Sequence, residues 1–120
     1  VGRFVGQRLA DLSRAHPLLF AGGALDWYDR CPEGEGFAAL HARCASFLAA
    51  LDGPATIVTH AITLRMIRLI VLGRPLTALA CSPVHQGAVH RLSRGRETVL
   101  RHPDDMDDAQ TLARPAPGGP

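Results

Sequence analysis

The residue with the clearest chemical potential is a histidine at the end of a short apolar run. Residues 55–59 (ATIVT) are rich in β-branched side chains and follow a turn at residues 52–54. They are therefore expected to form a buried parallel strand. His60 ends that strand, and a helix is expected from about residue 62 to 72. At such a strand end, backbone amides and the helix dipole favour an anion such as phosphate. The His60 imidazole could bond phosphate oxygens there, or it could simply cap the helix.

A second stretch, residues 26–37, gathers carboxylates, one arginine and aromatic rings just before another expected helix. Glu35 lies at the start of that helix, so it is either a helix-end partner or an active-site group. Because the helix dipole stabilises an ionised carboxylate, Glu35 would be a poor general acid at neutral pH. The neighbouring carboxylates are expected to be solvated and the two aromatic rings to cover core: Asp26, Asp29 and Glu33, with Trp27 and Tyr28.

Local patterns predict the elements that must position these residues. Val5, Leu9 and Leu12 have helical spacing within residues 4–15, and His16-Pro17 should end that helix. An ordered loop follows over residues 17–36. The strongest helical pattern runs from Phe37 to Leu51, and Gly73 should end the later helix in a left-handed conformation. Residues 86–91 and 97–101 are expected to pair as a hairpin.

Three successive segments resemble blocks of the histidine phosphatase superfamily, which is phosphoglycerate mutase-like. They are PEGEGFAALHARCASFLAAL, TIVTHAITLRMIRLIVLGRP and HQGAVHRLSRG. The resemblance implies an α/β class, a partial three-layer α/β/α fold that lacks its N-terminal strands. It also implies hydrolysis of small phosphomonoesters through a phosphohistidine, without a cofactor or metal. By the same resemblance, His60 is the second active-site histidine and contacts the phosphoryl group, and the amide of Ala61 lies beside it. Glu35 has a supporting role, and Arg43 matches an arginine on the following helix.

The departures from the family pattern are as informative as the matches. Ala61 replaces a glycine, and Gly36 replaces a serine at a helix cap. The sequence contains no Arg-His-Gly motif, which in the family carries the phosphorylated histidine. We therefore expect residues 1–101 to correspond to the C-terminal half of a member and to be inactive alone. The other five histidines are expected to be structural or solvated. Two alternatives stay open: a mutase, or a non-catalytic module that kept phosphate binding or protein association.

Composition sets the remaining expectations. The 120 residues predict one domain over 1–102 and a disordered acidic and Pro/Gly-rich tail over 103–120. The formal charge is +2, and no basic cluster is interleaved with aromatics, so nucleic-acid binding is not expected. No apolar run is long enough to span a membrane, which predicts a cytoplasmic protein. Three unpaired cysteines predict neither a disulfide framework nor a zinc site. An unpaired sheet edge would favour a homodimer.

Overall fold

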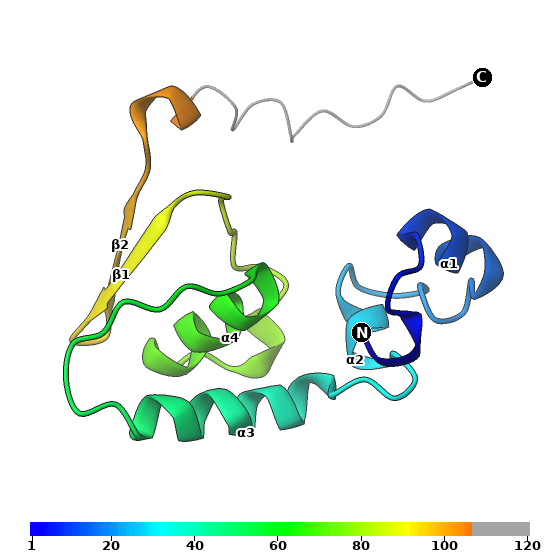
Figure 1. Ribbon diagram of the computed structural model, residues 1–120, viewed down its shortest axis with the longest axis horizontal. Helices are drawn as coiled ribbons and strands as arrows, with labels where there is room; N and C mark the ends of the chain where they lie inside the picture. Colours follow the sequence, from blue (N-terminus) through cyan, green and yellow to red (C-terminus); the bar gives the residue numbers. More distant parts are fainter. Residues whose placement is uncertain (107–120) are drawn as a thin grey trace. The chain divides into compact units, whose positions relative to one another are not determined.

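The computed structural model describes residues 1–106. They fall into two compact units, a helical one at Val1–Pro83 and a second one that starts at Val84 and contains a hairpin (Figure 1). The secondary structure therefore mixes helices with a small two-stranded sheet. Within residues 1–106 the sheet contains only these two strands, so the three-layer arrangement is not part of what is described.

The N-terminal segment forms a 3-10 turn, Gly2–Phe4, and a short helix, α1 (Leu9–Ala15). The helix ends at His16, as predicted, and the His16 amide donates to the Leu12 carbonyl at 2.8 Å. The prediction of a helix from residue 4 is wrong, because Gly6 adopts a left-handed φ of 81° that interrupts it. A small core forms here, with Leu19 and Phe20 packed against buried side chains: Phe4, Leu12 and Cys31.

The expected loop over residues 17–36 contains one helical turn, α2 (Asp26–Asp29). Its aromatic rings pack on other rings, as predicted for groups that cover core. Trp27 stacks on Phe20 at a centroid distance of 5.4 Å, and Tyr28 stacks on Phe37 at 5.8 Å. Together these contacts order the segment that leads into the next helix.

Asp29 was predicted to be only solvated, but its carboxylate also has a structural role. The backbone amide of Phe37 donates to Asp29 Oδ1 at 2.6 Å. This contact caps the first turn of α3 (Gly36–Ala49) from eight residues upstream. Gly36 has φ of 73°, and a Cβ there would lie 3.3 Å from the same carboxylate oxygen, so glycine suits this entry into the helix.

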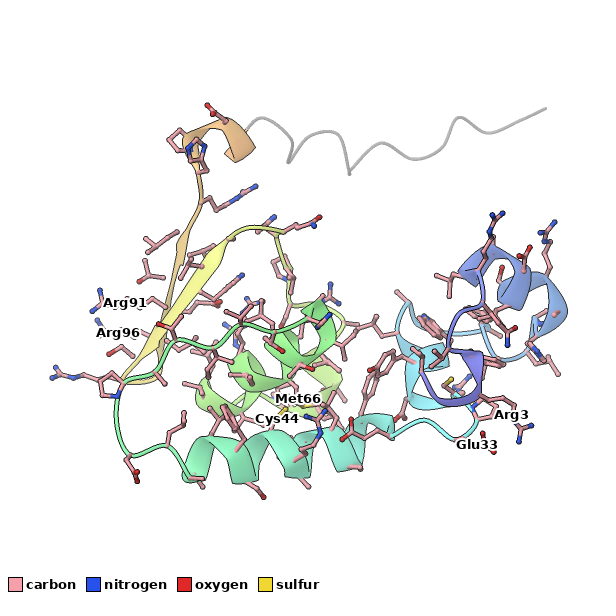
Figure 2. The ribbon with its side chains drawn as sticks, viewed as in Figure 1. Arg3, Glu33, Cys44, Met66, Arg91 and Arg96 are labelled. Carbon is pink, nitrogen blue, oxygen red and sulfur yellow. The ribbon has the colours of Figure 1, made fainter. Side chains whose placement is uncertain are left out.

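The two longest helices, α3 and α4 (Ala61–Val71), pack against each other. Figure 2 shows Cys44 of α3 beside Met66 of α4, at the contact between them. The buried positions on α3 are Leu40 and Cys44, and those of α4 include Met66, Ile67 and Leu69. Both helices were predicted, α3 from its apolar spacing and α4 from its position before Gly73, which follows α4 with a left-handed φ of 64°.

The predicted buried strand at residues 55–59 is wrong. The segment belongs to no strand, and its residues are exposed, with Val58 at 95% and Ile57 at 37% of full accessibility. A parallel strand needs neighbours on both sides. The two strands of the described chain pair only with each other, so this apolar run lacks a partner.

The second unit contains the predicted hairpin, β1 (Val89–Ser93) paired antiparallel with β2 (Arg96–Leu100). Arg94 and Gly95 both have positive φ, 52° and 71°, as a two-residue type I′ turn requires. The chain then forms a 3-10 turn at Pro103–Met106. The rest of the predicted tail, residues 107–120, lies outside the described residues. Among residues 1–106, no helix has the length and apolarity to cross a membrane.

Candidate functional site

His60 lies directly before the first turn of α4, as predicted, but the segment that it ends is not a strand. Its backbone is extended, with φ of −97° and ψ of 163°, and its carbonyl accepts a hydrogen bond from the Leu64 amide at 2.9 Å. The ring does not cap the helix by a side-chain hydrogen bond, which leaves the alternative role of a helix cap unsupported. The first amides of α4, including that of Ala61, have no acceptor within the helix. An exposed imidazole therefore lies next to unsatisfied N–H groups at the positive end of a helix.

A hollow of about 250 Å³ lies between α3, the extended segment before His60 and the first turns of α4. Its polar lining residues are Arg43, Thr59 and Thr63. The rest of its wall is less polar: Cys44, Phe47, Ile57, Val58 and Ile67. Thr59 immediately precedes His60, so the hollow and the histidine share the same segment of chain.

Glu35 and Arg43 form a two-point ion pair. Arg43 Nε donates to Glu35 Oε1 at 2.6 Å, and Arg43 Nη2 donates to Oε2 at 3.0 Å. The hydrogen bonds from Arg43 lower the pKa of Glu35, and the same contact raises the pKa of Arg43. Glu35 is therefore ionised at neutral pH and acts as an orienting partner for the arginine, which lines the hollow. This geometry argues against Glu35 as a proton donor.

The ion pair predicts a pH-dependent stability. Because the pKa of Glu35 is lowered in the folded state, the pair should stabilise the fold above the ordinary carboxyl pKa and lose that effect as pH falls. We expect Glu35→Gln to be less stable than the parent chain near neutrality. The difference should shrink as pH falls below the ordinary carboxyl pKa of about 4.3 and vanish only below the lowered pKa of Glu35 in the folded state. Urea unfolding from roughly pH 3 to pH 7 measures this. Asp52→Asn, at an exposed carboxylate, is the matched control; an unchanged Glu35→Gln deficit at all pH values would contradict the ion-pair argument.

The site can hold an oxyanion but shows no nucleophile of its own among the residues that line it. An arginine, two hydroxyls and helix amides are donors suited to phosphate. Burial raises the pKa of Cys44, so its thiol stays protonated at neutral pH and is a poor nucleophile. The hydroxyls of Thr59 and Thr63 were missed from the sequence. The sequence did contain a signal for them, because Thr59 lies one residue before His60 and Thr63 lies three residues after it.

The other singled-out residues lie elsewhere. Arg3 Nη2 is 2.9 Å from Glu33, and the Gly23 amide donates to Asp26 at 2.7 Å, so both carboxylates have structural contacts as well as solvent. His90 Nδ1 lies 2.7 Å from Glu97 on the hairpin. Over the described part of the chain, no three metal-binding side chains gather, and the cysteines are unpaired. Among the described residues, His60 forms no hydrogen bond or ion pair with Glu35 or Arg43. Arg43 lines the hollow together with Thr59, the residue before His60.

Comparison with known proteins gives one match. Residues 1–103 fit the family model of the histidine phosphatase superfamily, branch 1. No curated protein and no solved structure matches the chain.

Proposed function

The chain belongs to the histidine phosphatase superfamily, branch 1, and from this membership we propose that it forms the second-histidine half of a phosphatase active site. Phosphatase or mutase chemistry is the function of the superfamily at large. For this chain the proposed reaction is hydrolysis of small phosphomonoesters through a phosphohistidine intermediate. The observation that carries the proposal is the hollow next to the His60 segment at the start of α4, a mainly apolar hollow whose polar lining residues are Arg43, Thr59 and Thr63.

Each polar group of the site has a defined part in this proposal. The His60 imidazole and the Ala61 amide donate hydrogen bonds to the oxygens of the phosphoryl group. Arg43 balances the phosphate charge from α3, and Glu35 keeps the guanidinium in place. Thr59 and Thr63 add hydroxyl donors on either side of the histidine. These interactions stabilise negative charge that develops during transfer, without forming a covalent bond to the substrate.

The covalent step needs a group that this sequence does not contain. No Arg-His-Gly motif occurs in the 120 residues. In the proposed reaction the histidine of that motif attacks phosphorus, the ester P–O bond breaks, and the leaving oxygen takes a proton from a general acid. Water then attacks the phosphohistidine and releases phosphate. Glu35 cannot be that acid, because its ion pair with Arg43 keeps it ionised.

The unpaired run at residues 55–59 suggests where the missing group enters. Its apolar side chains are exposed and its backbone belongs to no sheet. A strand carrying Arg-His-Gly, paired with this run, would bury Ile57 and Val58 and bring its histidine to the strand end beside His60. Such pairing would complete the partial three-layer α/β/α fold. A second copy of the chain paired along the same edge, giving a homodimer, is the competing use of it.

Phosphate binding tests the site separately from turnover. We expect orthovanadate, a phosphate mimic, to bind this chain in a saturable manner, with His60→Ala weakening the affinity at least about tenfold. Equilibrium dialysis measures the binding, and His102→Ala, at an exposed histidine of the second unit, is the control. Binding that is unaffected by His60→Ala would remove the proposed site.

A non-catalytic phosphate-binding module is the second candidate. The missing Arg-His-Gly motif and the ionised state of Glu35 favour it. It predicts the same vanadate binding but no turnover, even when an Arg-His-Gly strand is supplied. A mutase would instead transfer the phosphoryl group to a second site on the substrate, and product analysis of a phosphorylated diol would separate it from a phosphatase.

A further inference from the structure

The hairpin carries a second positively charged site, distinct from the hollow beside His60. A depression of about 480 Å³ is lined entirely by residues of β1, β2 and their turn. Three of the five are arginines and the other two carry hydroxyls: Arg91, Arg94 and Arg96, with Ser93 and Thr98. Figure 2 shows Arg91 and Arg96 projecting from neighbouring positions of the hairpin.

The strand register explains why these side chains share one face. Arg91 pairs with Thr98, and Ser93 pairs with Arg96. Side chains two residues apart on a strand lie on the same side, so all four project together. Arg94 joins them from the turn, in which both Arg94 and Gly95 have a left-handed backbone. All five residues are exposed. The arrangement therefore follows from a regular two-residue hairpin and needs no unusual geometry.

The charge of this face is uncompensated. Within residues 1–106, none of Arg91, Arg94 and Arg96 forms an ion pair with a carboxylate. The one carboxylate of the hairpin, Glu97, alternates to the other face and contacts His90. Like charges held close together repel, and a bound anion would relieve that repulsion. Guanidinium groups also match phosphate oxygens two at a time.

We propose that this face of the hairpin binds a compact oligophosphate, a chain of linked phosphoryl groups. The three guanidinium groups neutralise successive phosphates, and the Ser93 and Thr98 hydroxyls donate to the remaining oxygens. No aromatic ring lines the depression, so it offers no stacking surface for the bases of a single-stranded nucleic acid. A peptide of acidic residues would carry less charge per length than linked phosphates. The proposal does not depend on phosphatase activity.

Titration calorimetry with inorganic tripolyphosphate tests the proposal, and it is done on the His60→Ala chain to remove the first phosphate site. We expect saturable binding that Arg91→Gln combined with Arg96→Gln weakens at least about tenfold. Arg8→Gln combined with Arg74→Gln removes the same charge from exposed positions of the other unit and should leave the affinity within about twofold. Arg91→Lys combined with Arg96→Lys, which keeps the charge but loses the two-point geometry, should give an affinity between these values.

Three results would overturn the proposal. One is the absence of saturable binding to the His60→Ala chain. Another is an equal loss in the two glutamine pairs, because binding would then follow net charge alone. The last is tighter binding of a single-stranded oligonucleotide or a polyaspartate peptide than of tripolyphosphate at the same ionic strength. Thermal unfolding of each variant, followed by circular dichroism, verifies that the hairpin variants keep the parent fold.

Discussion

In a chain that also carries an Arg-His-Gly strand, His60→Ala is expected to lower kcat on a phosphomonoester about 10²–10³-fold. The reason is the position of His60 at the start of α4, where its ring and the adjacent amides can donate to the transferring phosphoryl group. These donors act mainly on charge that develops in the transition state, so kcat should fall more than KM rises. Steady-state kinetics on both chains measures the effect.

Two companion variants make this result specific. His60→Gln keeps a hydrogen-bond donor but cannot carry positive charge, so it should retain more activity than His60→Ala. His102→Ala changes an exposed histidine of the second unit and should leave the kinetics unchanged. Equal losses in all three variants would point to a folding defect and would contradict a direct role for His60.

The largest expected effect on stability is at Leu40. This side chain is 1% exposed on α3, where α3 packs against α4, and truncation would leave a cavity between the two helices. Leu40→Ala should therefore lower the free energy of unfolding by about 2–5 kcal/mol. Leu18→Ala makes the same chemical change at a residue that is 86% exposed, and it should cost less than about 0.5 kcal/mol.

Urea unfolding of the two leucine variants gives the comparison. A similar loss in both would mean that α3 and α4 do not form a fixed core. A large loss at Leu40 alone would establish that core, which also fixes the two helices that carry Arg43 and Thr63.

Helices and the hairpin, which depend on residues close together in the sequence, were predicted well. Apolar spacing predicted α3, while Gly73 and Pro75 marked the end of α4, and a short polar turn at residues 93–96 predicted the hairpin. These elements satisfy most of their hydrogen bonds locally or with an adjacent strand. The run at residues 55–59 has equally strong strand character, but a parallel strand requires distant partners. The composition of this run therefore indicated that it can form a strand. Whether it does so depends on a partner strand that is not among the described residues.

The candidate site also contains a part that was predicted from local sequence and a part that was not. The position of His60 before a helix followed from the local pattern of strand residues, histidine and helix. The pairing of Glu35 with Arg43 was not anticipated as a contact, although both residues had been singled out, because it joins side chains eight residues apart. The cap from Asp29 to Phe37 crosses the same distance and was missed. Both contacts depend on how the chain enters α3 at Gly36, which composition alone does not specify.

Hydrolysis of p-nitrophenyl phosphate tests the central claim most directly, with this chain compared with one extended by an Arg-His-Gly strand. The proposal predicts turnover by the extended chain alone, with vanadate as a competitive inhibitor. An extended chain that is folded and binds vanadate, but hydrolyses neither this substrate nor a panel of natural phosphomonoesters, would contradict the phosphatase assignment and leave the phosphate-binding module in its place.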